Sequence, residues 1–517
     1  MSGGRLLLTP STQTNDITEL SVSAWFYRNR AIAGFDNPAR SLYVAVRELV
    51  ENSLDACEEA CVLPEITVLL RCQDEGPKDD IMTQGPEIFE LVVKDNGIGM
   101  KRKTVPLLLG KMLTGTKFTH RQSRGTFGLG GSLALLYGQV TTQKPIEIVT
   151  GQIGEPFGHQ VKMRLDIENN RPVILDEHEV AKSEDERGTM VTFSLQGDWL
   201  RSKRRIIEYF AQTAIIVPYA SLLFETPDAG IIRYDRVIHA SPKPTVAARP
   251  HPKGIDVEML RRMISMTRAK TLKSFLTTTF QRVGNTKASE FLAFAHLDSE
   301  RQPNSLTMDE LLRVMKSIES YDGFLPPSAN SLSPVGEEIL LAGVERLAPE
   351  LATFRQRPPC VHEGHPFIVE TGVAYGGSLN AGATVVRFAN RIPLLYDERS
   401  DVSYRVVRDL NLKNYGLSHE DPLTFIIHIC STRIPYKTVG KEYIADVDVV
   451  RREIELGFKD CLRDLSEKLR RRNRTQKSSK RETRLTSYYM FIAETLSKAT
   501  GRDIRLDRLL REGGDAE

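Results

Sequence analysis

The first strongly periodic stretch of the chain covers residues 41–62, where apolar residues recur every three or four positions. This spacing predicts an amphipathic helix. The same helix carries polar residues in register, because Glu48, Asn52 and Asp55 stand at i, i+4 and i+7 and therefore share one face. Such a stripe either faces water or lines a polar site, and the pattern of this helix alone leaves both alternatives open.

Alternation of apolar and polar residues downstream predicts a set of strands, and one further apolar run predicts a helix over residues 131–139. Polar, glycine-containing stretches at 74–87 and 101–131 are expected to be loops, the second of them mobile. Together these elements predict an α+β layer, with helices on one face of a mainly antiparallel sheet. The strands are expected at 65–72, 88–94, 146–152, 159–167 and 188–196.

Two proline-rich breaks, at 240–254 and 325–334, divide the rest of the chain. Short helices are expected between them, a β-rich region from Pro366 onward, and a long charged helix from about Val447. A chain of 517 residues is expected to form about three domains. The predicted domains are 1–240, 241–325 and 326–517.

Composition narrows the class of protein. Hydrophobic residues make up 40% and charged residues 26%, as in soluble globular proteins, and the net charge of +3 is weak evidence for any partner. The six cysteines form no C-x-x-C pair, which argues against a zinc site and a disulfide framework. No secretory leader and no apolar run of about 18 residues is recognised. We therefore expect no membrane association and an intracellular protein, cytoplasmic in an archaeon or bacterium and nuclear in a eukaryote.

Three further motifs carry candidate chemistry. Asp95 ends a strand in Asp-Asn-Gly-Ile-Gly, where its carboxylate can accept a hydrogen bond from a buried amino group, although Asp-Asn-Gly turns are common. A glycine-rich segment at 121–132 precedes a helix, and backbone N–H groups in such a loop bind phosphate. Its spacing differs from that of a Walker P-loop. Gly188-Thr189 opens a strand and can bring a hydroxyl to the same pocket.

In this order, the four motifs resemble the GHKL superfamily, whose ATP-binding domain is the Bergerat sandwich. The resemblance implies ATP and Mg²⁺ as cofactors. It makes Glu48 the general base, Asn52 the magnesium ligand, Asp95 the reader of the adenine amino group, and Thr189 its support through water. Asp55 is expected only to brace the pocket, and the glycine loop to close over the triphosphate. The implied nucleotide-binding residues are Asn52, Asp95, Gly99, Thr116, Lys117, Gly125, Thr126, Phe127, Gly128, Leu129, Gly130, Gly131, Thr189 and Lys441.

Longer stretches are similar to one family within GHKL, the B subunits of DNA topoisomerase VI. These stretches are 34–60, 121–139, 333–350, 357–377 and 387–397. The resemblance implies a small helix–two-turn–helix domain, with a turn around Gly284, and an α/β transducer domain with a long C-terminal helix. It also implies a transducer lysine that reaches the γ-phosphate and acts in catalysis. Lys441 matches that position, and Lys437 is its rival.

Candidate DNA contacts are carried by the same resemblance. The family motif Trp-Lys-x-Tyr is Leu412-Lys413-Asn414-Tyr415 here, so Lys413 and Tyr415 are retained and the tryptophan is not. Arg282 and Lys287 of the helical domain are further candidates, with ordinary surface charge as the alternative. The basic stretch 468–484 suits a DNA backbone, and 485–501 is expected to dock a partner subunit.

The implied function is that of the ATPase subunit of a type IIB topoisomerase. ATP-driven self-dimerisation through the ATP domain would gate the passage of one DNA duplex through a break made by the A subunit, relaxing supercoils and decatenating DNA. The implied partners are double-stranded DNA and the topoisomerase VI A subunit, in an A2B2 heterotetramer. The alternatives are another GHKL clamp, MutL-like or chaperone-like, and a non-hydrolysing scaffold like the meiotic relatives. A histidine kinase is disfavoured because the first histidine, His120, falls inside the lid.

Overall fold

The computed structural model describes residues 34–73, 86–110, 121–125, 130–166, 171–437 and 442–501. Its N-terminal part is an eight-stranded sheet with the order β5-β4-β3-β6-β2-β1-β7-β8. All neighbouring strands pair antiparallel except β1 and β7, which run parallel. The strands are β1 Glu65–Cys72, β2 Glu87–Lys94, β3 Ile146–Gly151, β4 Phe157–Asp166, β5 Arg171–Ala181, β6 Gly188–Gly197, β7 Ser221–Glu225 and β8 Ile231–Tyr234.

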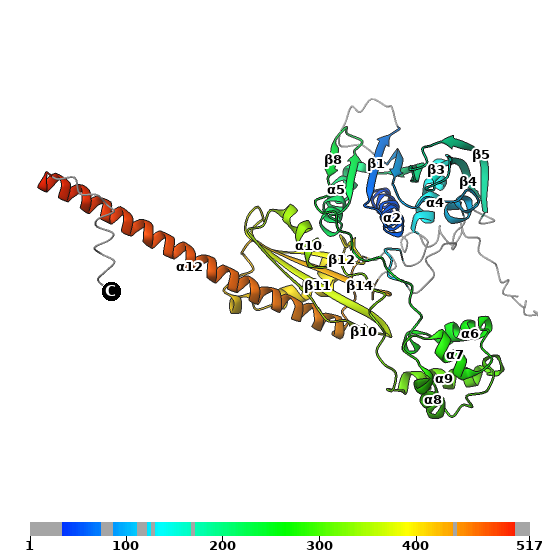
Figure 1. The fold of residues 1–517 in the computed structure, drawn as a ribbon. Helices are drawn as coiled ribbons and strands as arrows, with labels where there is room; N and C mark the ends of the chain where they lie inside the picture. The colour runs from blue at the N-terminus through cyan, green and yellow to red at the C-terminus, as the bar shows by residue number, and fades with distance from the viewer. Residues whose placement is uncertain are drawn as a thin grey trace, which may run out of the picture.

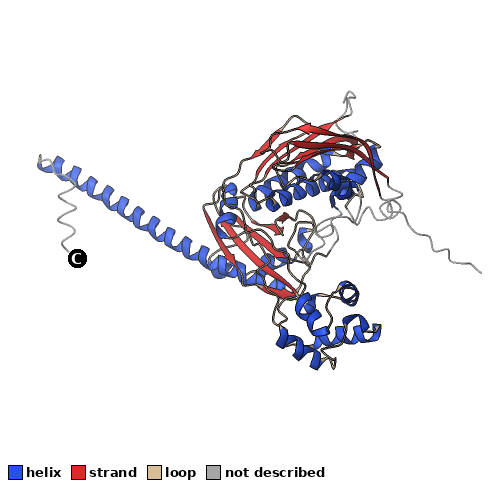
Figure 2. Cartoon of the chain, turned by 45° about the vertical axis from the view of Figure 1, so that its right-hand side comes forward, coloured by secondary structure: helices blue, strands red, loops and turns tan. Residues whose placement is uncertain are grey.

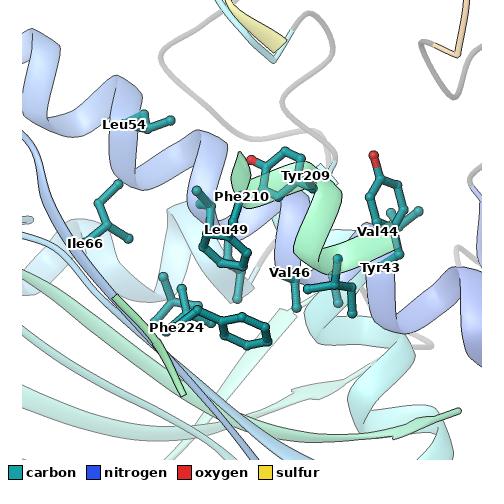
Figure 3. Close-up of a cluster of buried hydrophobic side chains, with 14 of the residues drawn as sticks. Tyr43, Val44, Val46, Leu49, Leu54, Ile66, Tyr209, Phe210 and Phe224 are labelled. Atoms are coloured by element: carbon teal, nitrogen blue, oxygen red, sulfur yellow. The ribbon is translucent and has the colours of Figure 1, made fainter. Parts of the chain in front are cut away.

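Three helices cover one face of this sheet: α2 Pro38–Glu59, α4 Gly130–Thr142 and α5 Trp199–Ile216 (Figure 2). α2 begins where Asn37 caps it, since the Asn37 side chain accepts from the Arg40 N–H and proline fills the first turn. The apolar side chains of α2 and α5 interdigitate above strands β1 and β7 (Figure 3). Phe210 of α5 stacks on Phe224 of β7 with ring centroids 4.7 Å apart. This packing fixes the polar face of α2 on the side away from the sheet core.

The predicted α+β class is confirmed, although helices α3 and α5 and strands β5, β7 and β8 go beyond the predicted elements. β5 was not expected, because it is an edge strand whose side chains are mostly exposed and so show no alternation to read. Within the expected loop 101–131, residues Val105–Gly110 form helix α3, preceded by a 3-10 turn at Arg102–Thr104. Val105 is fully buried there, and a Cβ added at Gly110 would press on Pro172 of β5. Contact with the sheet therefore orders this part of the stretch.

A small helical module with its own core follows. It consists of α6 Val257–Met266, α7 Leu272–Thr279, α8 Asn285–Phe294 and α9 Met308–Ser320, and it lies apart from both sheets (Figure 1). The predicted turn lies between α7 and α8. Its left-handed residue is Arg282, with φ 59°, whereas Gly284 has φ −87° and serves as the N-cap of α8. The glycine is therefore not the residue that reverses the chain.

The C-terminal part holds a second sheet, with the order β10-β11-β14-β12-β13 and β9 paired to β11. Its strands are β9 Leu351–Gln356, β10 Cys360–His362, β11 His365–Tyr375, β12 Ala383–Ala389, β13 Ile392–Pro393 and β14 Leu423–Ser431. The β-rich region thus begins at Leu351, upstream of the expected Pro366. Helix α10 Glu337–Val344 covers one face of this sheet, next to α5, while α11 Val402–Asp409 and α12 Asp448–Thr500 pack into a separate core.

The two sheets are joined by packing. Val335, Ile339 and Phe388 of the C-terminal part belong to the same buried cluster as α2 and α5. α10 lies so close to α5 that a Cβ at Gly343 would overlap the carbonyl group of Ile215. On the opposite face, Gly457 lets α12 lie against β11, since its Cβ would approach the Thr371 hydroxyl to 2.7 Å. The second sheet and its helix α10 therefore pack directly on α5 and on α2, the helix that carries the polar stripe.

Helix α12 is 53 residues long and leaves the body of the molecule as a single rod (Figure 1). Leu462 and Leu465 are fully buried against the sheet, and Leu469 packs on the same core. From Arg470 onward most described side chains are exposed. In the described part of the chain, no helix is long and apolar enough to cross a bilayer.

Candidate nucleotide site

The polar stripe of α2 faces the N-terminus of α4, not bulk water. A Cβ added at Gly130 would overlap the carboxylate of Glu48, and one added at Gly131 would lie 2.7 Å from Asn52 Nδ2. The exposed fraction of Glu48 is only 7%. The two glycines therefore let the helix start approach both side chains directly. Backbone N–H groups at a helix N-terminus are unsatisfied and favour anions, so such a helix start is suited to hold a phosphate.

Glu48 is held by the residue before it. Arg47 Nη2 donates to Glu48 Oε1 at 2.6 Å, and Arg47 Nε lies 3.4 Å from Glu51 Oε1. Burial alone would lower the pKa of Arg47, but the two carboxylates outweigh it and raise that pKa well above its usual value. The guanidinium therefore stays charged and fixes the orientation of the Glu48 carboxylate.

Asp95 lies at the end of β2 and is almost fully buried. Its Oδ1 accepts from the Gly97 N–H at 2.9 Å and from the Thr189 N–H at 3.1 Å, while its Oδ2 accepts from the Ser53 hydroxyl at 2.9 Å. Burial raises the pKa of Asp95 above its ordinary 3.8, although all three hydrogen bonds oppose that shift. The Asp95 carboxylate is thus fixed in orientation and largely shielded from solvent. Both properties are expected of a group that recognises a hydrogen-bond donor on a ligand.

Thr189 joins this group through β6. Its hydroxyl lies 3.0 Å from that of Thr150, which also donates to the Gly188 carbonyl at 3.0 Å and accepts from the Met100 N–H at 2.9 Å. Gly99 has φ 69°, and a Cβ there would overlap the Gly151 carbonyl. Gly99 is therefore required by its conformation and by its close approach to β3, and it keeps the loop after Asp95 flat against the sheet.

Asp55 completes the stripe at the base of the glycine loop. Arg124 Nη1 donates to Asp55 Oδ1 at 2.8 Å, and Arg124 Nη2 donates to Glu58 Oε1 at 2.7 Å. Gly125 follows, and its carbonyl accepts from the Ser123 hydroxyl at 2.7 Å. The stripe thus contacts both ends of the glycine loop. Asp55 contacts the residues before the loop, and Glu48 and Asn52 contact the glycines that follow it.

A hairpin of the second sheet domain reaches the start of α2. Tyr436 and Ile444 form an antiparallel bridge, and Glu442 forms an ion pair with Arg40 of α2. Burial raises the pKa of Tyr436 above its usual value, and the nearby Glu51 carboxylate raises it further. Residues 438–441, which follow the first of these arms in the chain and include Lys441, lie outside the described residues. Lys437 lies on the described arm with an exposed side chain.

Six other predicted nucleotide-binding residues also fall outside the described ranges, and their roles stay predictions. They are Thr116, Lys117, Thr126, Phe127, Gly128 and Leu129.

None of the candidate DNA-binding residues belongs to this site. Lys413 is exposed, and Tyr415 packs partly against the core next to α12. Leu412, in the place of the family tryptophan, is buried in that core, which explains why an aliphatic side chain is accommodated. Arg282 is exposed, and Lys287 is paired with Glu290 at 2.7 Å.

Four buried residues of the site were not anticipated: Arg47, Ser53, Thr150 and Arg391. Ser53 follows Asn52 in the chain, and Arg47 precedes Glu48, so both belong to the predicted helix. Thr150 lies in a predicted strand but bonds to residues 38 and 39 positions away. Arg391 lies in a turn of the second sheet, and only the tertiary structure brings it to Glu58, 3.1 Å away.

Comparison with known families agrees with this geometry. The family model described as "Histidine kinase-, DNA gyrase B-, and HSP90-like ATPase" matches residues 37–198, and "Topoisomerase VI B subunit, transducer" matches 327–481. The B subunit of type 2 DNA topoisomerase 6 from Saccharolobus shibatae is 39% identical over 482 residues, which cover 92% of this chain and 89% of that protein. The corresponding protein from Metallosphaera sedula is 38% identical over 485 residues, covering 93% and 90%.

Among solved structures, the 43K ATPase domain of Thermus thermophilus gyrase B in complex with an aminocoumarin is similar at 13% identity. The match covers 90% of this chain and 97% of that one, with a TM-score of 0.37, which is too low to carry an argument.

The fold, the site and the ATPase family match define an ATP-binding protein of the GHKL class. The second family match and the sequence identity to the two relatives then specify the family within that class. The chain belongs to the B subunits of type 2 DNA topoisomerase 6, the ATPase subunits of the type IIB topoisomerases.

Proposed function

We propose that the chain hydrolyses ATP at the face of α2 that carries Glu48, Asn52 and Asp55, and uses the nucleotide cycle to gate DNA strand passage. One observation carries the proposal. The glycines that open α4 leave no room for a side chain between the helix N-terminus and Glu48 or Asn52. A solvated stripe has no need of such close approach, whereas a phosphate cradle with a base beside it does.

The residues then take distinct roles. Glu48, oriented by Arg47, is positioned to accept a proton from the attacking water. Asn52, which lies against the start of α4, offers an amide oxygen of the hard type that Mg²⁺ binds. When bound, the ion would neutralise phosphate charge, and Asn52 would hold it. The buried Asp95 carboxylate would accept a hydrogen bond from the adenine amino group, and Thr189 and Gly99 would shape the pocket around it.

The hairpin at 435–445 is suited to sense the terminal phosphate. Its arms are held together by the Ala445 N–H, which donates to the Pro435 carbonyl at 2.8 Å, and Glu442 of the returning arm pairs with Arg40 of α2. We assign Lys441, in the segment between these arms, to the γ-phosphate, because an ammonium on a flexible stem suits a phosphate that appears and disappears.

The remaining partners follow from the family. ATP binding would close two copies of this chain through their ATP domains around a duplex. The second sheet would transmit that closure to the A subunit, which cleaves the other duplex, in an A2B2 heterotetramer. This chain itself would cut no DNA. Exposed cations support contact with the DNA backbone: Lys413 and Arg282 as single residues, and the row beginning at Arg470 on α12. Domain limits at 240 and 325 belong to this proposal, and limited proteolysis would test them.

Two assays test the proposal. The purified chain should turn over ATP in the presence of Mg²⁺, and a Glu48→Ala variant prepared in parallel should not. On addition of a cognate A subunit, supercoiled plasmid should relax only with ATP. ATP turnover without relaxation would favour a GHKL clamp of another kind, whereas relaxation without turnover by this chain would exclude the site described.

A further inference from the structure

We propose that the turn Asn390–Arg391 of the second sheet positions the base of the nucleotide lid, residues 121–125. This inference rests on the proposed function and deepens it, because it names a second route by which the sheet and the ATP site are coupled. The turn joins β12 to β13, and both of its residues are left-handed, with φ 47° and 67°. Non-glycine residues adopt this conformation at a cost, and arginine has no local hydrogen bond to favour it. Such strain is retained where the side chains are needed in place.

Both side chains leave the sheet toward the ATP domain and are buried. Asn390 Nδ2 donates to the Ser123 carbonyl of the lid base at 3.0 Å, and the same side chain is fixed by Ser431 of β14 through its N–H and its carbonyl, each at 3.0 Å. The lid backbone is therefore bonded to an amide that the sheet holds rigidly.

Arg391 meets the lid through a shared acid. Its Nη1 lies 3.1 Å from Glu58 Oε1 and 3.2 Å from the Tyr219 hydroxyl, and Arg124 of the lid base donates to the same Oε1 at 2.7 Å. Burial would raise the pKa of Glu58, but Arg124 and Arg391 outweigh it and lower that pKa below 4.5. The Glu58 carboxylate thus pairs with one guanidinium from the lid base and one from the sheet. Displacement of either guanidinium would change the charge that the other one faces.

The turn is braced from behind. The Arg391 N–H donates to His428 Nε2 at 3.1 Å, which leaves the proton of that ring on Nδ1, facing Glu370 Oε2 at 2.7 Å. Glu370 also accepts from the N–H groups of Val335 and Gly336, at 2.8 and 2.7 Å. His428 and Glu370 are fully buried in neighbouring strands, so the turn must move with the sheet.

The lid base is held by other parts of the chain as well, but not by close packing on every side. Gln122 exchanges two hydrogen bonds with the backbone of Ser333, and Arg121 donates to the Thr245 hydroxyl at 2.6 Å. Beside them is a cavity of about 120 Å³, lined by the lid base, the turn, residues 241–245 and the end of α2 with the residues that follow it. Because interiors are otherwise close-packed, this space lets the lid base change its arrangement without displacing core side chains.

The two couplings act at opposite ends of α2. The described arms of the hairpin lie at the start of that helix, where Glu442 pairs with Arg40, and the proposed function assigns Lys441 between them to the γ-phosphate. The turn lies near its end, at Glu58, and contacts the lid base directly through Asn390. Rotation of the sheet should therefore change the position of the lid base directly, and closure of the lid over ATP should bias the sheet by the same free energy.

The test uses two variants of the turn in the full-length chain. Asn390→Gly keeps the left-handed backbone, which glycine adopts freely, and removes the bond to Ser123. Arg391→Gln removes the charge shared with the lid. Arg405→Gln is the matched control, since it removes an arginine whose ion pair with Asp446 lies elsewhere on the same domain. Melting temperature is measured for each, and Asn390→Gly keeps the test valid if Arg391→Gln fails to fold.

The readouts separate lid position from general damage. We expect the KM for ATP to rise by roughly 2–10-fold in Asn390→Gly and by about tenfold or more in Arg391→Gln, in line with one neutral and one charged hydrogen-bonding group lost. The Kd for ADP, which does not require closure over a triphosphate, should stay within about twofold, because neither side chain is placed in the nucleotide pocket. Dimerisation driven by a non-hydrolysable ATP analogue should weaken in parallel with KM.

Equal losses of ATP and ADP binding would overturn the inference, because they would indicate a damaged pocket. So would turn variants that match Arg405→Gln in every assay while the parent chain hydrolyses ATP. A parent chain that turns over no ATP would overturn the proposed function, and this inference with it.

Discussion

Substitution of Gly130 by alanine is the sharpest perturbation of the site that the structure suggests. An added Cβ would overlap the Glu48 carboxylate, and Cβ atoms essentially never come within 3.0 Å of another heavy atom. The carboxylate must therefore shift by about 1 Å or more, and misplacement of a catalytic group by about 1 Å can cost ~10²-fold in rate. A general base contributes ~10²–10⁴-fold in total. We expect Gly130→Ala to lower kcat for ATP by roughly 10²-fold.

Stability should change little, which makes the variant informative. Gly130 is the first residue of α4, and alanine in a helix is favoured over glycine by about 0.5–1 kcal/mol. The displaced Glu48 rotamer costs of the same order, about 0.5–1.5 kcal/mol. Gly284→Ala is the matched control, since that glycine also lies at a helix N-terminus and its added Cβ would meet nothing within 4 Å.

The assay is steady-state ATP hydrolysis, with ADP affinity and melting temperature measured alongside. The double variant with Glu48→Ala should be no slower than Glu48→Ala alone, because both changes act through one carboxylate. Hydrolysis by Gly130→Ala at the parent rate would refute the placement of Glu48 against α4. Loss of ADP binding together with hydrolysis would refute the claim that the effect passes through the base.

Further substitutions give separate readouts. Glu48→Ala should retain ATP binding, lose most hydrolysis and accumulate closed dimers, which cross-linking would detect. Asp95→Asn should weaken ATP binding in calorimetry without lowering the melting temperature at neutral pH, because burial raises the pKa of Asp95 and its charged form is costly there. Lys441→Ala should slow hydrolysis and uncouple it from strand passage with ADP affinity nearly unchanged, and Lys437→Ala should do much less; an analogue-bound structure with Lys437 at the γ-phosphate would reverse this choice. Glu58→Gln should destabilise the chain at pH 6–7, and the difference from the parent should shrink as pH falls below the unfolded value near 4.5, because a lowered pKa contributes stability only above that range; a difference independent of pH would contradict this.

Local periodicity was sufficient to predict α2 and its polar stripe, because three residues at i, i+4 and i+7 share a helix face whatever surrounds them. What they face could not be read from spacing. Glu48 meets Gly130, 82 positions away, and the identification of that partner depended on the resemblance to GHKL proteins. The geometry then gives the stripe a physical reason that the motif alone lacks.

Arg391 shows where prediction from the sequence ended. Its neighbour Asn390 favours turns, but nothing in the sequence connects Arg391 with its partners Glu58 and Tyr219, which lie 333 and 172 positions earlier in the chain. Long-range contacts between charged residues leave no periodic signal in one sequence. β5 escaped prediction for the opposite reason, because an edge strand exposed on both faces has no buried side to impose a pattern.

The free part of α12 turns small rotations into long displacements. The helix is packed as far as Leu469 and continues to Thr500, so roughly 45 Å of it projects as a rigid arm at 1.5 Å per residue. A tilt of about 10° at the sheet would carry its tip through roughly 8 Å, more than two base-pair steps at about 3.4 Å each. Because Gly457 seats the helix directly on β11, no soft layer lies between the sheet and the arm to absorb that tilt. For a given tilt, the displacement of the tip is therefore proportional to the length of the projecting helix. Shortening the helix by whole turns should reduce that displacement in proportion.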